Sequence, residues 1–234
     1  MRIYMDFNEV YSETQRNIYE LGIHVHPKTY QDKYVADDPG FETMELQNYE
    51  FMLVNPSSEN IKPFTIQPWA DLEFEERITN TTGKEKINPG KAWESRKDVW
   101  EQFIEPSTGK FGYSYNERLW SSGQLDKIIN RIKEDPESRQ LWLSIWNPDI
   151  DIDKLGGVSR VPCSLGYHFM VREGQLNMTY LMRSNDFGTH FADDVYEAVK
   201  LLEYVSEKTG YKVGHFNYWC GSLHLFKKDY EVIF

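Results

Sequence analysis

The chain has 234 residues, of which 40% are hydrophobic and 15% aromatic, and its formal net charge is −11 at pH 7. These values predict one domain over residues 1–234 and argue against a binder of polymeric DNA or RNA, whereas a mononucleotide needs only a few positive groups in one pocket. The N-terminus has no apolar signal region and no segment is apolar enough to cross a bilayer, so we expect a soluble, cytoplasmic protein.

The first half of the chain predicts helices and one long strand joined by loops. Residues 7–22 form an amphipathic helix that ends at Gly22, and its expected core face is Phe7, Val10, Tyr11, Ile18 and Leu21. Residues 42–56 favour a strand, residues 68–80 a short helix rich in carboxylates, residues 80–118 irregular loops, and residues 123–139 a helix with buried Leu125, Ile128, Ile129 and Ile132.

The second half is rich in strands. Residues 140–147 favour a strand, and two alternating segments follow, with Leu165, Tyr167, Phe169 and Val171 on the core face of the first and Leu176, Met178, Tyr180 and Met182 on that of the second. A helix that ends at Gly210 and a last strand near residues 213–226 complete the pattern. We therefore expect an α/β (α+β) fold, with one large twisted mixed sheet packed against helices.

The two alternating segments place the two halves of a candidate site together. If Glu173 and Gly174 form a two-residue hairpin turn, Cys163 lies opposite Ser184 and beside Arg183. A guanidinium next to a thiol favours the reactive thiolate. Taken alone, a cysteine at the start of a strand is more often a small core residue. No cysteine or histidine spacing indicates a metal site, and Cys220 is expected to serve packing only.

Several motifs, in this order, resemble the thymidylate synthase family. They are "EDPESRQ", "WNPD", "VPCSLGYHF", "MRSNDFG", "FADDVY" and "GSLHLF". The wording is most similar to the deoxycytidylate (dCMP) hydroxymethylases of phages. The resemblance implies the family's mixed-sheet fold, a homodimer formed through the sheet, and 5,10-methylenetetrahydrofolate as the cofactor.

The resemblance also implies roles for individual residues. Cys163 is similar to the cysteine that adds to carbon 6 of the pyrimidine, because carbon 5 is a poor nucleophile until such an adduct forms. Arg183 and Ser184 resemble the residues that hold the nucleotide phosphate. Arg139 is similar to an arginine that reaches the phosphate in the partner subunit, while Gln140 stands where the family has a second one.

Further positions follow from the same motifs. Asp186 resembles the aspartate placed against the folate, and His224 the histidine on the sugar 3′-hydroxyl. Two residues later the family usually has a tyrosine, where this chain has Phe226. Glu73 is the candidate for the glutamate that manages proton transfers, and Tyr113 for a loop tyrosine near the cysteine.

The residue that reads the base lies at the start of the helix after "RSND". Thymidylate synthases have an asparagine there, whereas the hydroxymethylases carry an aspartate, which when ionised suits the cytosine amino group. Asp194 takes this position when residues are counted from Arg183, and Ala192 takes it when they are counted from Tyr196.

We therefore expect a transferase that makes 5-hydroxymethyl-dCMP. The alternatives are a thymidylate synthase or dUMP hydroxymethylase, and a nucleotide-binding relative without catalysis. Family members continue well past the last strand and close that segment over the folate, whereas the segment after the last strand is short here. A more hydrated site would favour quenching the transferred carbon with water.

Overall fold

The computed structural model describes residues 1–31, 33–156 and 159–234. The strands are β1 Arg2–Tyr4, β2 Ile23–Val25, β3 Thr29–Tyr30, β4 Lys33–Tyr34, β5 Thr43–Leu53, β6 Ile104–Glu105, β7 Lys110–Phe111, β8 Trp142–Ser144, β9 Ser164–Arg172, β10 Gln175–Asp186 and β11 Lys212–Phe226. The helices are α1 Phe7–Leu21, α2 Ser58–Ile61, α3 Trp69–Ile78, α4 Lys91–Ser95, α5 Lys97–Trp100, α6 Tyr115–Trp120, α7 Gln124–Glu134, α8 Pro148–Asp151, α9 Phe191–Thr209 and α10 Tyr230–Ile233.

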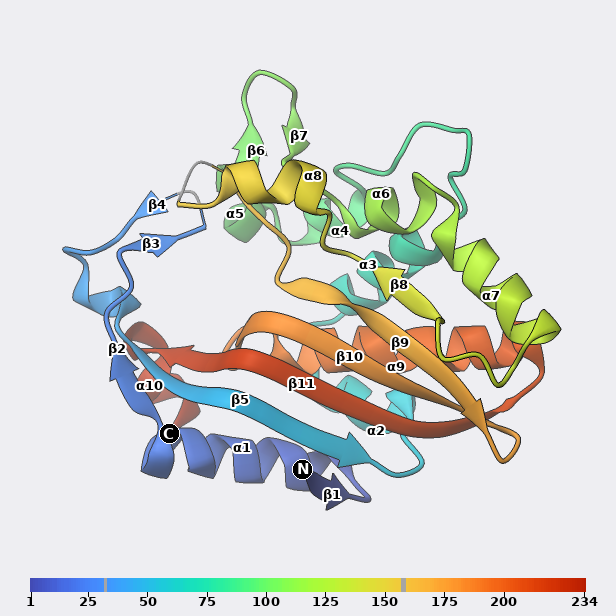
Figure 1. Ribbon diagram of the computed structural model, residues 1–234. Helices are drawn as coiled ribbons and strands as arrows, with labels where there is room; N and C mark the ends of the chain where they lie inside the picture. Colours follow the sequence, from blue (N-terminus) through green and yellow to red (C-terminus); the bar gives the residue numbers. More distant parts are fainter. Residues whose placement is uncertain (32, 157–158) are drawn as a thin grey trace.

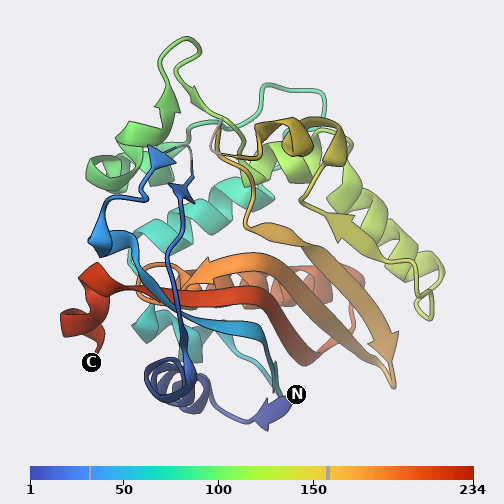
Figure 2. The ribbon, with the colours of Figure 1, turned by 60° about the vertical axis from the view of Figure 1, so that its left-hand side comes forward.

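One mixed sheet organises the molecule, in the order β1–β5–β11–β10–β9–β8, with β2 also paired to β5. The pair β10–β11 is parallel, whereas β9–β10 and β5–β11 are antiparallel. Figure 1 shows α9 behind β10 and β11, and α1 along β5. In Figures 1 and 2 β6, β7, α6 and α8 lie above the sheet, while β8, between α7 and α8 in the chain, forms its edge. The expected fold, a large twisted mixed sheet with packed helices, is confirmed.

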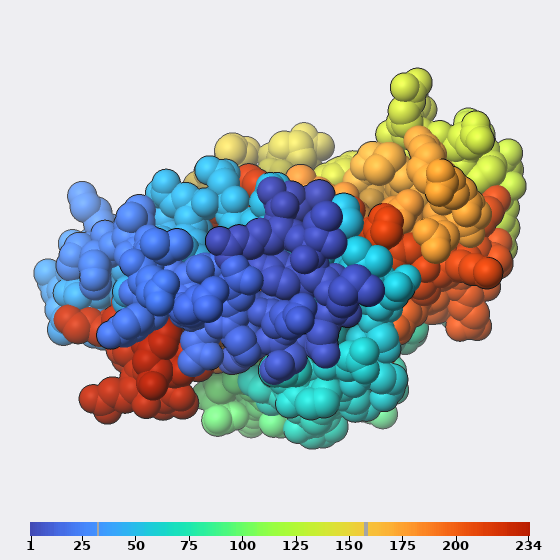
Figure 3. Space-filling view, turned by 90° about the horizontal axis from the view of Figure 1, so that it is seen from below, coloured from blue at the N-terminus to red at the C-terminus, as the bar shows by residue number. Residues whose placement is uncertain are grey.

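The N-terminal helix forms as its periodicity predicts. The Asp6 carboxylate accepts a hydrogen bond from the Asn8 backbone N–H at 2.8 Å, which caps the first turn of α1. Phe7, Val10 and Ile18 are buried, but Leu21 is 64% exposed, so its assignment to the core was wrong. Figure 3 shows the face of the molecule that α1 covers, with the C-terminal residues at its edge; there the Phe234 ring lies 5.0 Å from that of Tyr19.

The hairpin of β9 and β10 follows the predicted register as far as Gly166. Leu181 pairs with Gly166, but Met182 pairs with Ser164, so a bulge removes one residue from the register. A Cβ on Gly166 would lie 2.4 Å from the Leu143 carbonyl oxygen, which explains the glycine at this point. The bulge also moves Leu165 off the core face that the alternation predicted, and leaves it half-buried.

The core lies between the sheet and α9. The predicted positions Leu176, Met178, Tyr180 and Met182 of β10 are all buried, and so are Val195, Ala198, Val199, Leu202 and Val205 of α9. The helix ends at Gly210 in the left-handed conformation, with φ of 81°. This arrangement directs the start of α9 toward the ends of β10 and β11.

The segment expected to be irregular, residues 80–118, contains short elements from α4 to the start of α6. The helix α6 begins with a capping box, in which the Ser114 hydroxyl accepts from the Glu117 N–H and the Glu117 carboxylate accepts from the Ser114 N–H. Such helices of one or two turns carry too little periodicity to be read from sequence.

Candidate active site

A cavity of about 330 Å³ lies where the ends of β10 and β11, the helix α3, the start of α9 and the loop before β9 meet. Eight of the residues predicted from the sequence line it: Glu73, Tyr113, Cys163, Arg183, Ser184, Asp186, Asp194 and His224. The tertiary structure thus brings these eight positions to one site.

The Cys163 thiol lies against the C-terminal end of β10, beside Arg183 and Ser184. The Cys163 sulfur lies 3.8 Å from Nη2 of Arg183 and 3.8 Å from the Ser184 hydroxyl oxygen. Because of the bulge, Cys163 is opposite Arg183 rather than Ser184, and its carbonyl accepts from the Arg183 N–H at 2.8 Å. Both side chains nevertheless reach the thiol, so a fixed cation and a hydroxyl lie beside the sulfur.

The Arg183 guanidinium is held by the loop that carries the thiol. Its Nε donates to the Pro162 carbonyl at 2.9 Å, Nη2 donates to the Val161 carbonyl at 3.2 Å, and Nη1 donates to the Ser184 hydroxyl at 3.0 Å. These bonds fix the cation beside the sulfur before any ligand binds, which is the pre-organisation that nucleophilic catalysis needs.

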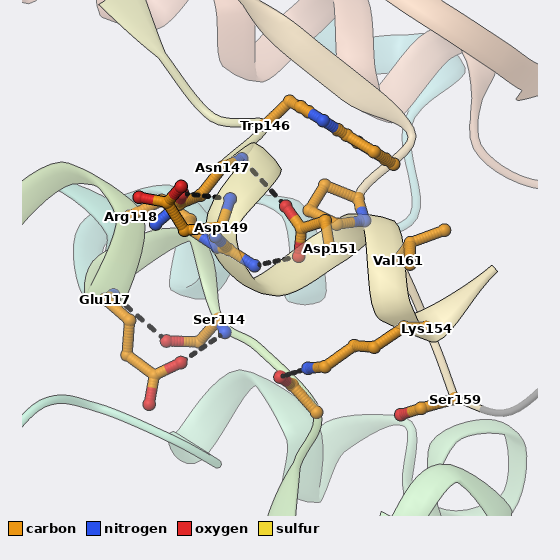
Figure 4. A network of polar contacts seen from close by, with 12 residues as sticks. Ser114, Glu117, Arg118, Trp146, Asn147, Asp149, Asp151, Lys154, Ser159 and Val161 are labelled. Atoms are coloured by element: carbon orange, nitrogen blue, oxygen red, sulfur yellow. Dashed lines mark hydrogen bonds and ion pairs between the residues drawn. The ribbon is translucent and has the colours of Figure 1, made fainter.

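A network of polar contacts joins α6 and α8, which precedes the loop that carries Cys163 (Figure 4). Arg118 donates to the Asp151 carboxylate at 2.6 Å, and the other oxygen of Asp151 accepts from the Asn147 N–H at 2.8 Å. Lys154 donates to the Gly112 carbonyl at 2.8 Å. These contacts attach α8 to α6, and the turn after α8 to the segment before α6, so the chain that leads toward Cys163 starts from a fixed point.

Acidic groups form one wall of the cavity. Burial raises the pKa of Asp194 to about 7, although Arg77 acts in the opposite direction. Burial also raises the pKa of Glu73, again against Arg77, whose Nη2 lies 3.3 Å from Glu73 Oε1. Arg77 pairs in addition with the buried Glu197 and packs on the Tyr115 ring, 4.0 Å from its centroid. Carboxyls with raised pKa values in a cavity are suited to proton transfer near neutral pH.

Arg77 and Glu197 were not predicted from the sequence. Their spacing carried a signal, because Arg77 follows Glu73 by four positions and Glu197 follows Asp194 by three, and such pairs share a helix face. A charged side chain on a buried helix face needs an oppositely charged partner, so such a pattern indicates an ion-paired cluster.

The two aspartates at the start of α9 have different surroundings. Asp194 lines the cavity, whereas the Asp193 carboxylate accepts from the Ile66 N–H at 2.8 Å. Asp193 is buried, so it does more than complement the helix dipole. Ala192, the alternative position for the residue that reads the base, is not among the described residues that line the cavity.

The far end of the cavity contains a second polar group. Asp186 and His224 are partners in the parallel pair β10–β11. Burial lowers the pKa of His224, although Asp186 opposes this, so the imidazole is neutral near pH 7. The Asp186 carboxylate accepts from the Gly188 N–H at 3.0 Å. Ser222 Oγ lies 3.4 Å from Nδ1 of His224 and donates to Glu45 at 2.5 Å.

An aromatic wall, which the sequence did not reveal, completes the cavity. The Trp69 and Trp100 rings are stacked with centroids 6.4 Å apart, and the Arg160 guanidinium lies 4.9 Å from the Trp100 centroid. Within the described ranges, the buried Nε of Arg160 and the indole nitrogens of Trp93 and Trp100 have no hydrogen-bond partner. Flat rings with free donors fit a planar ligand that is rich in acceptors.

Arg139 lies away from this cavity, on the sheet surface. It is exposed, and its carbonyl accepts from the His168 imidazole at 3.1 Å. A shallow depression there is lined by Arg139, Trp142, His168, Thr179 and Leu181. The described part of the chain places Arg139 outside its own Cys163 site.

Two further features are absent from residues 1–31, 33–156 and 159–234. In these ranges no group of histidine, cysteine, aspartate and glutamate side chains could hold a metal ion. No helix there is both long and apolar enough to span a membrane.

Comparison with known proteins gives a consistent result. The thymidylate synthase family profile matches residues 75–233, which is more than half of the chain. A protein of Methanosarcina barkeri named "Putative thymidylate synthase" is 26% identical over 232 residues, covering 92% of this chain and 94% of the relative. A protein of the same name from Methanocaldococcus jannaschii is 31% identical over 187 residues, covering 70% and 82%.

The fold agrees with a solved structure. The thermostable thymidylate synthase A of Bacillus subtilis superposes with a TM-score of 0.72 over 98% of this chain and 83% of that chain, at 18% sequence identity. These relatives are named as thymidylate synthases rather than dCMP hydroxymethylases. The comparisons therefore support the expected alternative better than the hydroxymethylase that the motif wording had favoured.

Proposed function

This chain belongs to the thymidylate synthase family, and we propose that it transfers a one-carbon unit to carbon 5 of a pyrimidine deoxynucleoside monophosphate. The observation that carries the proposal is the Cys163 thiol, 3.8 Å from a fixed guanidinium, at the wall of a cavity that also contains Glu73, Asp194 and His224. Binding of a nucleotide alone would not need a thiol held in this way.

The chemistry follows from the thiol and the ring. The Cys163 thiolate adds to carbon 6 of the pyrimidine, and the electron pair of the 5,6 double bond moves to carbon 5 and the neighbouring carbonyl. Carbon 5 then becomes nucleophilic enough to accept the one-carbon unit. Loss of the carbon 5 proton and release of the one-carbon unit from its carrier would leave a methylene group on carbon 5. Addition of a hydride from the reduced carrier, which gives the methyl product, or of water, which gives the hydroxymethyl product, and departure of Cys163 would then restore the double bond.

Glu73 is the proposed group for the proton transfers. Its carboxyl lines the same cavity, and burial raises its pKa above the usual value of a glutamate, which suits a group that takes up and releases a proton. Arg77, paired with both Glu73 and Glu197, fixes the position of the Glu73 carboxylate. Tyr113 lines the cavity as a neutral phenol, since burial raises its pKa, and can orient water beside the thiol.

The phosphate is the proposed ligand of Ser184 and Arg183, assisted by Arg139 of a second copy. The sheet surface around Trp142 and Arg139 supports a dimer, because both residues are exposed there and no helix covers β10 and β11 on that side of the described chain (Figure 1). On the same strands, His215 Nδ1 and Asn217 Oδ1 are buried without a partner among the described residues. A second copy packed on this face would satisfy such groups.

The family implies methylenetetrahydrofolate, and the aromatic wall fits its flat, acceptor-rich ring. Trp69, Trp93, Trp100 and Arg160 would hold that ring, with Asp186 at its polar edge. The cofactor would supply the one-carbon unit at the oxidation level of formaldehyde. The protein's own part is to orient this group and to exclude water with the indole rings.

The base is proposed to be uracil, in agreement with the names of the relatives. A neutral Asp194 can accept from the uracil N3–H and donate to the O4 carbonyl, as an asparagine would. Cytosine is the second candidate, and the specific observation in its favour is that a carboxyl rather than an amide occupies this place in the cavity. An ionised Asp194 would accept from the cytosine amino group.

Release of the carbon 5 hydrogen tests the proposal directly. Tritium at carbon 5 of dUMP, dCMP and CMP is followed as it passes to water, with and without methylenetetrahydrofolate. We expect release from dUMP, from dCMP or from both, and dependence on Cys163. The absence of release from all three nucleotides would leave a nucleotide-binding relative without catalysis as the better description.

A further inference from the structure

The cavity wall beside His224 has an apolar ring next to the polar groups. Phe226, two positions along β11, is 3% exposed, and its ring centroid lies 5.1 Å from that of His224. A phenylalanine ring offers no hydroxyl. If His224 binds a sugar hydroxyl, this wall needs a second hydrogen-bonding group, because a buried hydroxyl left partly unpaired weakens binding.

The structure places a phenol on the same ring from a distant part of the chain. Tyr30, the last residue of β3, lies edge-on to Phe226, with ring centroids 5.3 Å apart and planes at 89°. Tyr30 lines the cavity together with His224, so the two polar side chains flank Phe226. The Phe226 ring, which also lines the cavity, thus packs against the Tyr30 ring.

The Tyr30 hydroxyl is free to bind a ligand. Within the part of the chain that the structure describes, it makes no recorded hydrogen bond, although Tyr30 is half-buried. Burial raises its pKa to about 12, and the negative charge of Asp186 acts in the same direction. The phenol is therefore neutral, belongs to a residue that lines the cavity, and can both donate and accept.

We propose that Tyr30 and His224 together bind the sugar 3′-hydroxyl of the nucleotide, so that β3 supplies the hydroxyl that Phe226 does not. The inference rests on the proposed function, since it takes the ligand to be a deoxynucleotide. One sugar hydroxyl has one proton to donate and two lone pairs. A neutral imidazole and a neutral phenol can pair with these groups without leaving a buried charge.

Paired nucleotides that differ only at the 3′ position test this assignment. Binding of dUMP and 2′,3′-dideoxy-UMP, and of the corresponding cytosine pair, is measured by calorimetry with the full chain and with Tyr30→Phe. We expect Tyr30→Phe to weaken binding of the 3′-hydroxyl nucleotide about fivefold, the effect of one hydrogen bond, and to leave the dideoxy nucleotide unchanged. The unchanged affinity also shows that the variant is folded.

Tyr34→Phe is the matched control. Tyr34 lies on β4 in the same small hairpin, is 69% exposed and is not among the residues that line the cavity. It should leave both affinities unchanged. If the parent chain binds the nucleotides but Tyr30→Phe changes neither affinity, or weakens both members of a pair equally, this inference is overturned alone. If the parent chain binds none of them, the proposed function is overturned with it.

Discussion

The ionisation of Asp194 should control which base the site accepts. Its pKa, raised by burial to about 7, makes the carboxyl about 90% neutral at pH 6 and about 90% ionised at pH 8. The neutral form can pair with uracil or cytosine, whereas the ionised form repels the O4 carbonyl of uracil. We therefore expect the ratio of kcat/KM for dUMP to that for dCMP to fall nearly tenfold from pH 6 to pH 8.

The assay compares the two nucleotides in one pH series from 5.5 to 8.5. Because both substrates use the same thiol and the same Glu73, the ratio cancels the titration of those groups. Asp194→Asn should give a ratio that stays near the value of the parent chain at pH 6 and does not change with pH, since an amide always donates and accepts. Asp193→Asn is the control, because that carboxyl is buried with a pKa of about 7 but binds the Ile66 N–H instead of lining the cavity.

A ratio that stays constant from pH 6 to pH 8 in the parent chain would refute the reasoning. Loss of the pH dependence in Asp193→Asn, with the dependence retained in Asp194→Asn, would show that Asp193 rather than Asp194 recognises the base. Either result is independent of whether the product carries a methyl or a hydroxymethyl group.

The same raised pKa has a consequence for stability. The folded chain keeps the Asp194 proton from about pH 4 to pH 7, while the unfolded chain has lost it, so the free energy of unfolding falls as pH rises through this window. The slope is about 1.4 kcal/mol per pH unit for one proton. Asp194→Asn should remove this part of the slope, as measured by urea unfolding at pH 4, 5.5 and 7; an identical slope in the variant would argue against a raised pKa.

Three other predictions concern the thiol, the assembly and the loop support. Cys163→Ser should abolish hydrogen release from carbon 5 and change nucleotide affinity only several-fold, because the phosphate contacts remain; normal turnover would rule out the thiol as nucleophile. If Arg139 serves the neighbouring site, a mixture of inactive Cys163→Ser and Arg139→Ala chains should recover activity through one intact site per heterodimer, and no recovery after verified subunit exchange would contradict this. Asp151→Asn should lower the free energy of unfolding by about 3 kcal/mol, because Arg118 stays buried without its counter-charge, whereas Asp135→Asn at the exposed Arg131 pair should cost less than about 1 kcal/mol; equal losses in urea unfolding would show that burial of the first pair does not matter.

Much of the architecture could be predicted because it depends on local periodicity. The alternation in β10 and the helical spacing in α9 place apolar side chains on one face, and burial of that face determines the element. The motifs around Cys163 and Arg183 were also readable, because a two-residue turn brings nearby segments of the chain together. These interactions span few residues, so the sequence contains enough information to locate them.

Contacts between distant segments could not be predicted in this way. The bulge at Gly166 depends on how closely β8 approaches β9, and it changes the partner of Cys163 by one residue. Tyr30 meets Phe226 across almost 200 positions, and no periodicity indicates that contact. Asp193 and Asp194 look alike in sequence, yet the docking of α9 turns one toward Ile66 and the other into the cavity. Sequence determined which chemical groups the protein has; only the packing of α9 and β3 against the sheet decided which of them line the cavity, because burial and orientation depend on neighbours that are remote in the chain.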